Sequence, residues 1–340
     1  RDYYASRGLG DVYKRQPYTV NEKGQGPAWS NSLFEDNAEF GYGMLLAQKA
    51  IRGGLKAKVE DVMNSEKAPE EVKAACKEYL DTFDCGATNG TATEKLVEAI
   101  KDADCDVCRD IVKNKDFLAK KSQWIFGGDG WAYDIGFGGV DHVLASGQDV
   151  NIMVFDTEVY SNTGGQSSKA TPTGAIAQFA AGGKEVKKKD LASIAMSYGY
   201  VYVAQIAMGA DYNQCVKAIA EAEAYPGPSL VIAYAPCINH GIKVGMSKAQ
   251  TEEKLAVEAG YWHTFRYNPA LKAEGKAAFS LDSKAPTGDY KAFLNGEVRY
   301  NALARFNPER AEELFAKSEE TAKERYEYLN KLITLYGGEN

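Results

Sequence analysis

Short apolar segments alternate with longer amphipathic ones between residues 122 and 260, and no other feature constrains the fold of this chain as strongly. Each apolar segment has the length of a buried strand, and glycine or proline follows most of the longer segments, where a helix commonly ends. Strands are predicted at residues 123–126, 151–155, 201–207 and 229–235, and helices at 139–146, 190–198, 212–224 and 248–259. Such alternation predicts an α/β fold, with a mostly parallel sheet and helices on both faces.

Further helices are predicted on either side of this core. One begins near residue 33, with Asn31 or Ser32 as its N-cap, and ends at Gly53 and Gly54, because glycine commonly ends a helix. The other runs from residue 308 to 335, where leucine and alanine recur at helical spacing.

The composition also suggests a division of the chain into parts. Residues 1–16 show no hydrophobic period, and they are either foreign to the natural protein or a natural terminus without fixed structure. Residues 17–300 are predicted to form one α/β domain, into which the charged, alanine-rich residues 55–121 are inserted as a helical arm. Residues 268–296 are predicted to be irregular, and residues 301–340 to form a helical extension.

Charge and apolar content exclude several classes of protein. A net charge of −7 argues against a nucleic-acid-binding surface. No apolar run has the length that spans a bilayer, and no secretory signal opens the chain, so we expect no membrane partner. The six cysteines are unevenly spread and do not resemble a disulfide framework, which favours the reducing cytoplasm.

Acidic and small polar residues follow the first two predicted strands. Asp129 stands among Gly127, Gly128 and Gly130 after the first strand, and Asp156 with Thr157 follows the second. The carboxyl ends of parallel strands are where such sheets bind ligands, and a carboxylate with a hydroxyl oxygen suits Mg²⁺. The glycines are expected to let the backbone approach a ligand and to adopt conformations that a side chain forbids. The pattern therefore predicts a seat for a metal–diphosphate.

The sequence around these residues resembles a known family. GDGWAYDIGFGG at 128–139, followed by DTEVYSNTGGQSSKATP at 156–172, is similar to the thiamin diphosphate motif of pyruvate:ferredoxin (flavodoxin) oxidoreductase. The resemblance extends upstream to PYTVNEKGQGPAWSNSLFEDNAEFGYGM and downstream to APCINHG. It covers residues 17 to 340 and is weakest in the arm, and it implies the C-terminal, thiamin diphosphate-binding part of that enzyme.

The resemblance implies a role for each residue of the motif. Asp129 would supply a carboxylate to Mg²⁺, Thr157 a side-chain oxygen and Val159 a backbone carbonyl, while Gly128 and Gly130 would cradle the diphosphate. The residues themselves leave structural roles open: Asp129 also suits a helix cap, and Thr157 suits a turn in which the hydroxyl bonds its own backbone.

Two more residues acquire roles through the resemblance. Asn162 would lie near the thiazolium and its reacting carbon, although asparagine also suits a turn. Cys237 would be one ligand of a [4Fe–4S] cluster. The other three ligands, and the Glu that activates the cofactor, are expected upstream of residue 17, so the chain is expected to be N-terminally truncated. Cys105 and Cys108 do not match these ligand positions and are interpreted as reduced surface cysteines.

The implied function is oxidative decarboxylation of pyruvate to acetyl-CoA in anaerobic metabolism. Electrons would pass to the cluster and then to ferredoxin or flavodoxin, in a cytoplasmic homodimer that includes the remaining domains. The chain alone is expected to be inactive. Another 2-oxoacid:ferredoxin oxidoreductase and a non-catalytic cofactor-binding fragment remain as alternatives. A dinucleotide fold is disfavoured because Tyr133 stands where the third glycine of its fingerprint is needed.

The histidines and one lysine-rich run are further candidate functional residues. His142 and His263 are interpreted as structural, whereas His240 could line a pocket near Cys237 or be structural. The four lysines of residues 184–189 are interpreted as a solvated loop, with a docking patch for an acidic electron carrier as the alternative.

Overall fold

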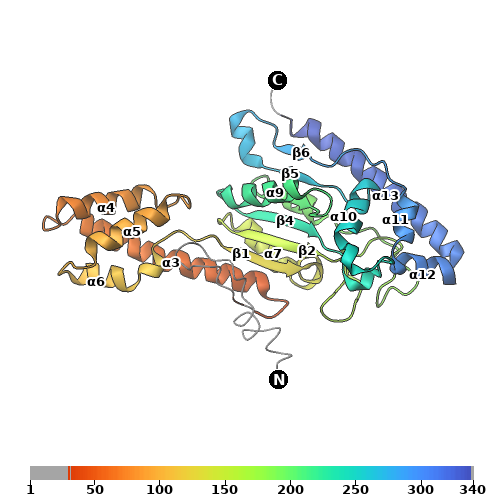
Figure 1. The fold of residues 1–340 in the computed structure, drawn as a ribbon, viewed down its shortest axis with the longest axis horizontal. Coiled ribbons are helices and arrows are strands. Elements are labelled where there is room, and N and C mark those ends of the chain that lie inside the picture. The colour runs from red at the N-terminus through yellow and green to blue at the C-terminus, as the bar shows by residue number, and fades with distance from the viewer. Residues whose placement is uncertain (1–29, 31, 338–340) are drawn as a thin grey trace.

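A computed structural model describes residue 30 and residues 32–337 of the chain. Its centre is a six-stranded sheet with the strand order β1-β2-β4-β3-β5-β6 (Figure 1). The strands are β1 (Trp124–Gly128), β2 (Asn151–Asp156), β3 (Tyr202–Ile206), β4 (Ser229–Tyr234), β5 (Phe265–Tyr267) and β6 (Phe279–Leu281). The first four are parallel, whereas β5 runs antiparallel to both of its neighbours, β3 and β6. The four predicted strands and the mostly parallel sheet are confirmed, whereas β5 and β6 were not predicted.

Strand register brings the carboxyl ends of β1, β2 and β4 to one edge of the sheet. Gly128 at the end of β1 pairs with Phe155 of β2, and Asp156 pairs with Tyr234 at the end of β4. The interior strands are rich in Val and Ile and are buried along most of their length, as parallel strands usually are. The loops after β1 and β2 are therefore neighbours in space.

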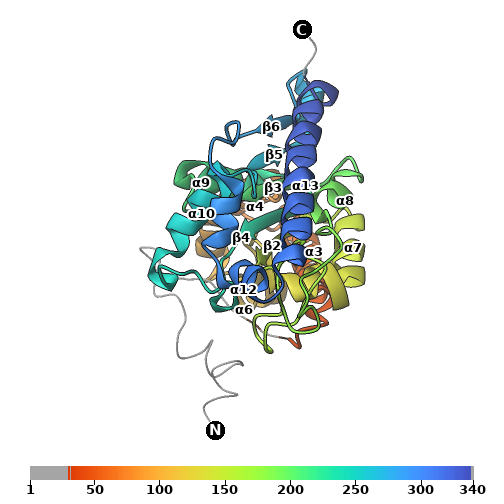
Figure 2. The same cartoon turned by 90° about the vertical axis from the view of Figure 1, so that its right-hand side faces the viewer.

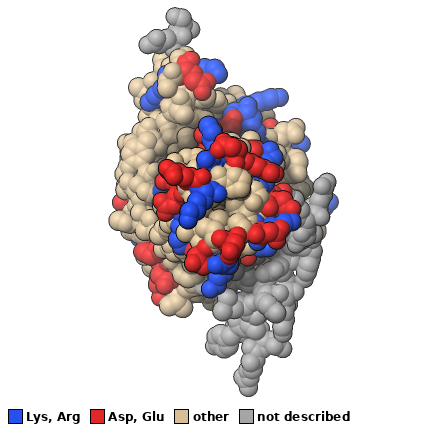
Figure 3. All heavy atoms as spheres, turned by 90° about the vertical axis from the view of Figure 1, so that its left-hand side faces the viewer, with Lys and Arg blue, Asp and Glu red and all other residues tan. Residues whose placement is uncertain are grey.

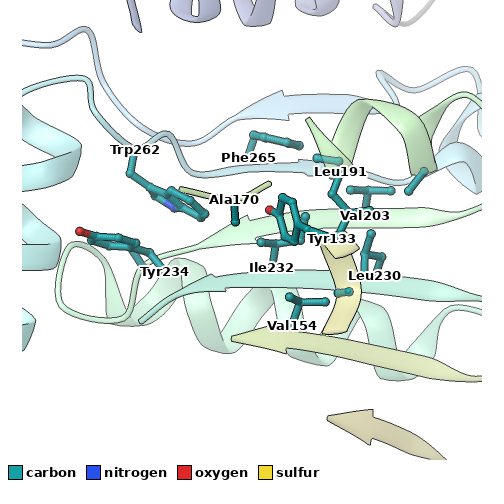
Figure 4. Packing of buried hydrophobic residues seen from close by; sticks show 14 of the residues in the cluster. Tyr133, Val154, Ala170, Leu191, Val203, Leu230, Ile232, Tyr234, Trp262 and Phe265 are labelled. Atoms are coloured by element: carbon teal, nitrogen blue, oxygen red, sulfur yellow. The ribbon is translucent and has the colours of Figure 1, made fainter. Parts of the chain in front are cut away.

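Helices cover both faces of the sheet, as predicted. The helices packed around it are α7 (Phe137–Ala145), α8 (Leu191–Met196), α9 (Tyr212–Ala224), α10 (Ala249–Glu258), α11 (Tyr290–Asn295), α12 (Val298–Phe306) and α13 (Pro308–Leu335). Alternate residues of β2 face opposite ways: Val154 packs in the large core with α7, α8 and α13, and Met153 packs in a smaller core with α9. Figure 2 shows α13 lying along the sheet, and Figure 4 shows Tyr133, Val154 and Ile232 within the large core.

The arm is a separate helical unit built on α3 (Asn37–Met63). Helices α4 (Glu70–Asp81), α5 (Asn89–Ile100) and α6 (Asp106–Lys113) pack with the end of α3 around their own apolar core, away from the sheet (Figure 1). A short 3-10 helix, η1 (Lys115–Phe117), leads back to β1. Figure 3 views this side of the molecule, where side chains of both charges are interspersed.

The prediction that the first helix ends at Gly53 and Gly54 is wrong. Helix α3 continues through both glycines, because Leu55, Val59 and Val62 are buried against the arm helices. That packing outweighs the roughly 1 kcal/mol by which each interior glycine disfavours a helix. The predicted cap is also wrong at Ser32, since the N-cap residue is Asp36, and Asn31 lies outside the described residues.

The prediction of irregular structure at 268–296 is wrong as well. This range contains a 3-10 helix η5 (Pro269–Glu274), strand β6 and helix α11. Each is six residues or shorter, too short to show a hydrophobic period. The long helix at 308–335 is confirmed as α13. Among the described residues, no helix combines the length and apolar character needed to cross a membrane.

Candidate functional site

Asp129 lies at the junction of β1 and a single π-helical turn, η2 (Gly130–Ile135). Its carboxylate is fully buried, and both oxygens accept hydrogen bonds. Oδ1 accepts from the backbone N–H of Thr157 at 3.1 Å and from its Oγ1 at 2.7 Å, while Oδ2 accepts from Ser168 Oγ at 2.6 Å. Burial, and secondarily the nearby Asp156 carboxylate, raise the pKa of Asp129 to about 7.

The oxygens of Asp129, Thr157 and Val159 converge in one place. Thr157 Oγ1 lies 2.7 Å from Asp129 Oδ1, 3.0 Å from the Val159 carbonyl oxygen and 3.2 Å from Ser161 Oγ. Octahedral Mg²⁺ with bonds of about 2.0–2.1 Å places adjacent ligand oxygens about 2.9 Å apart, so the spacing fits such an ion. The set contains one carboxylate, and no group of three or more His, Cys, Asp or Glu that could hold a metal occurs in the described part of the chain.

The glycines around Asp129 serve different purposes. A Cβ at Gly127 would lie 2.2 Å from the buried ring of Trp131, and one at Gly130 would lie 2.6 Å from the ring of Tyr160. At Gly128 the nearest atom to an added Cβ, a backbone oxygen, is 4.0 Å away. None of the three has a positive φ, so the expected left-handed backbone is absent at these positions. Gly128 alone leaves open space that a ligand could use.

Glu158, which lies between the expected metal ligands Thr157 and Val159, has a left-handed backbone with φ of 60°. Such a conformation is strained for a non-glycine residue and costs on the order of 1–3 kcal/mol. The Glu158 side chain is 1% exposed and is held by three partners. Oε1 accepts from Lys188 Nζ at 3.0 Å, and Oε2 accepts from Tyr261 Oη at 2.6 Å and from Arg299 at 2.7 Å. These contacts offset the strain and fix the turn that presents the Val159 carbonyl.

Lys188 belongs to this buried network, and the prediction of a solvated loop is wrong for it. Its ammonium lies 2.8 Å from Asp156 and 3.0 Å from Glu158, whose side chains are 0% and 1% exposed. Tyr133 also donates to Asp156, at 2.7 Å. Of the neighbouring lysines, Lys187 is exposed as predicted.

The charges in this network shift one another's pKa values. Burial would raise the pKa of Glu158, but Lys188 and Arg299 outweigh it and lower that pKa to about 2. For Asp156, burial prevails and raises the pKa, although Lys188 opposes it. Glu158 is therefore charged at neutral pH. Sequence reasoning missed this network because its members are separated by as many as 141 residues.

Asn162 lies in an exposed turn after Tyr160. The turn is closed by hydrogen bonds from Tyr160 N to Gln166 O and from Gly165 N to Tyr160 O, both 2.9 Å. Gly165 has a φ of 77°, and a Cβ there would lie 2.9 Å from Asn239 Oδ1. The turn that carries Asn162 therefore packs against the loop that carries Cys237.

Cys237 is half-buried at the start of η3 (Ile238–His240), where the backbone and side-chain N–H groups of Asn239 donate to its Sγ at 3.5 Å. His240 is fully buried, with Nε2 3.0 Å from the Thr157 carbonyl oxygen and Nδ1 3.4 Å from Glu297. His240 thus contacts the backbone of the loop that carries Thr157.

The other two histidines lie apart from these loops. His142 on α7 meets Tyr42 edge to face at 5.8 Å, and His263 is buried against Tyr326 of α13 at 5.6 Å. Burial lowers the pKa of His263 to about 4, so it is neutral at physiological pH. Both contacts are those of packed side chains, in agreement with the predicted structural roles.

Comparison with known proteins agrees with this geometry. A family model described as the thiamine pyrophosphate enzyme C-terminal TPP-binding domain matches residues 114–233. The chain is 58% identical to the pyruvate-flavodoxin oxidoreductase of Enterobacter agglomerans, over 94% of this chain and 28% of that protein. It is 56% identical to the Klebsiella pneumoniae pyruvate-flavodoxin oxidoreductase and 57% identical to the Moorella thermoacetica pyruvate:ferredoxin oxidoreductase, in each case over 93% of this chain and 27% of the relative.

The chain thus spans 27–28% of the length of these relatives. The matched region contains β1, β2, the intervening π-helical turn and the converging oxygens between them. Residues 114–233 therefore match the model of the thiamine pyrophosphate enzyme C-terminal TPP-binding domain, in a chain that is similar along most of its length to part of the pyruvate-flavodoxin and pyruvate:ferredoxin oxidoreductases.

Proposed function

We propose that this chain binds thiamin diphosphate (TPP) through Mg²⁺, as the cofactor-binding part of a pyruvate:ferredoxin or pyruvate:flavodoxin oxidoreductase. The observation that carries the proposal is that Thr157 Oγ1 lies 2.7 Å from Asp129 Oδ1 and 3.0 Å from the Val159 carbonyl oxygen, beyond the ends of β1 and β2. Two of these oxygens are uncharged, so the ion would keep positive charge for the diphosphate, as Mg²⁺ usually does.

Each residue would have a definite task. Asp129 would lose its proton to bind the metal, which makes binding stronger as the pH rises toward the raised pKa of this carboxyl. Gly128 would leave room for the diphosphate, and Asn162, in its exposed turn, would lie beside the reacting atoms. Bound TPP supplies the electron sink for decarboxylation of a 2-oxoacid. The residues of this chain bind and orient it.

The residues present do not by themselves fit an iron–sulfur cluster. A [4Fe–4S] cluster is held by four thiolates, and Cys237 belongs to no group of three or more His, Cys, Asp or Glu side chains that could hold a metal in the described structure. The remaining cysteines lie on the arm and on α9. We propose Cys237 as one ligand, with the others supplied by the remaining domains of the full enzyme.

The relatives' names support a further part of this proposal, which concerns the full-length enzyme. It comprises pyruvate and coenzyme A as substrates, ferredoxin or flavodoxin as electron acceptor, a role in anaerobic metabolism, a homodimeric full-length enzyme and a cytoplasmic location. The chain would lack turnover when tested alone, because it spans 27–28% of the relatives' length.

Thermal unfolding tests cofactor binding directly. Mg²⁺ with TPP at about one hundred times its Kd should stabilise the chain by about 2.7 kcal/mol and raise its Tm by roughly 5 °C. Asp129→Asn should abolish the shift. Asp149→Asn is the matched control, because Asp149 pairs with Lys120 at 2.8 Å just before β2, at the opposite end of the strand. No shift in the wild-type chain, or an equal shift in Asp129→Asn, would contradict the proposal.

A further inference from the structure

The proposed function leaves the cysteine pair of the arm unused. Cys105 is the N-cap of α6, with extended φ and ψ of −145° and 125°, and its carbonyl accepts from Arg109 N at 2.9 Å. Cys108 is the third residue of that helix. Helix geometry places Cα atoms three positions apart in the chain about 5 Å from each other, and a disulfide requires Cα atoms about 4.4–6.8 Å apart. The first turn of α6 is therefore compatible with a disulfide between them.

The two thiols are unequally exposed. Cys105 is half-buried and reaches solvent, whereas Cys108 is 4% exposed within the apolar core of the arm, so the prediction of a surface position is wrong for Cys108. Cys76 on α4, which is fully buried in the same core, lies close enough to influence Cys108. All three thiols are free in the structure. A reagent from solvent can reach Cys105 before the other two.

The electrostatic surroundings reinforce this difference. The pKa of Cys105 is lowered, chiefly by the nearby backbone N–H of Cys108 and then by its thiol. The N-terminus of α6 further favours a thiolate. Asp106 opposes it, but Arg109 pairs with Asp106 at 2.5 Å and offsets that charge. Burial, and then the contact with Cys105, raise the pKa of Cys108 to about 11.

We propose that Cys105 and Cys108 form a thiol–disulfide exchange site in the arm, with exposed or low-molecular-weight disulfides as its substrates. The Cys105 thiolate attacks one sulfur of the substrate disulfide and expels the other as a thiolate. Cys108 then loses its proton to solvent and attacks Cys105 Sγ, expelling the second substrate thiolate. The protein dithiol is oxidised by two electrons, and one substrate disulfide is reduced to two thiols.

The site is independent of the proposed cofactor function. It lies on α6, in the helical unit away from the sheet, and not on the loops after β1 and β2 (Figure 1). The side of the molecule that carries the arm shows both charges interspersed, so no field of one sign restricts the substrate (Figure 3). The other exposed thiol of the arm, Cys85, lies in the turn before α5.

Incubation of the folded chain with glutathione disulfide, followed by acid quenching, alkylation and peptide mapping, tests the proposal. The wild-type chain should acquire a Cys105–Cys108 bond. Cys108→Ser should stop at a glutathione adduct on Cys105, and Cys105→Ser should leave position 108 unmodified. Cys85→Ser and Cys76→Ala are the controls, and both should still form the 105–108 bond.

A rate measurement separates this site from ordinary surface oxidation. The pKa of Cys105 is lowered and that of Cys108 is raised to about 11, so the thiolate fraction at neutral pH is larger for Cys105 than for Cys108. Cys105 should therefore be alkylated far faster than Cys108 in the native chain. Equal alkylation rates, a bond between Cys76 and Cys108, or persistent glutathione adducts at Cys105 in the wild type would overturn the proposal.

Discussion

The protonation of Asp129 should be measurable as a pH-dependent difference in stability between the wild-type chain and Asp129→Asn. The carboxyl is fully buried, and burial together with Asp156 raises its pKa from 3.8 to about 7. An asparagine of nearly the same shape cannot titrate. Substitution therefore removes one proton-binding site whose affinity differs between the folded and unfolded states.

The linkage between proton binding and folding sets the sign and the size of this stability difference. Between about pH 4 and about pH 7 the folded chain holds the Asp129 proton and the unfolded chain has lost it, so stability falls as the pH rises. Each unit of pH in this range costs about 1.4 kcal/mol, and from about pH 5 to about pH 8 the loss is about 2–3 kcal/mol. The free energy of unfolding of the wild type relative to the variant should fall by this amount.

Other buried groups titrate near this range, so the difference between variants is the informative quantity. Burial raises the pKa of Glu252 to about 7, which lowers stability with rising pH, and burial lowers the pKa of His263 to about 4, which has the opposite effect. Both occur in the wild type and in Asp129→Asn and cancel on subtraction. Glu158, with a pKa of about 2, loses its stabilising charge only in stronger acid.

Urea unfolding of both proteins, followed by circular dichroism at four pH values from about 5 to about 8, gives the required free energies. A difference between the two proteins that stays constant within about 0.5 kcal/mol over this range would refute the reasoning. Repeating the series with Mg²⁺ and TPP adds a second expectation. Ligand-induced stabilisation of the wild type should increase with pH, because the metal binds the ionised carboxylate, whereas the variant should show none of this increase.

Two further substitution pairs test the buried network and the glycines. Lys188→Met should destabilise the chain by about 3 kcal/mol in urea unfolding, because it leaves the buried Asp156 without a cation and Glu158 with Arg299 alone. Lys187→Met should change the free energy of unfolding by less than about 0.5 kcal/mol, and similar losses in the two variants would contradict the assigned contacts. Gly127→Ala should lower the free energy of unfolding by about 1–3 kcal/mol or more, because the added methyl group clashes with Trp131. Gly128→Ala should fold normally but lose the Tm shift with Mg²⁺ and TPP. Retention of that shift by Gly128→Ala would remove Gly128 from the proposed diphosphate site.

Sequence patterns predicted the parts of the fold that depend on local information. Strands β2, β3 and β4 are apolar runs because they are buried along most of their length, and α13 carries buried apolar residues at helical spacing near both of its ends. The proximity of Asp129 and Thr157 followed from the position of each after a parallel strand. The three-residue strands β5 and β6 carry no such pattern, because their burial comes from antiparallel pairing that chain order does not reveal.

Tertiary packing decided the features that were predicted incorrectly. Gly53 and Gly54 stay helical because the following residues are buried against the arm. Lys188 lies in a basic run, which is typical of a solvated loop, yet its ammonium binds carboxylates that precede it by about thirty residues. A single sequence offers no periodicity that would identify such a distant partner.

The geometry of the proposed metal site depends on these distant partners. Val159 can present its carbonyl beside Thr157 because Glu158 adopts a left-handed backbone, which costs on the order of 1–3 kcal/mol. Arg299, on α12, holds that glutamate at 2.7 Å, and its loss would leave a buried carboxylate with one cation fewer. Because such a loss costs more than the strain itself, the turn is held by the C-terminal helices as well as by its own sequence. The ligands come from a short motif, but their arrangement requires residues up to 141 positions away.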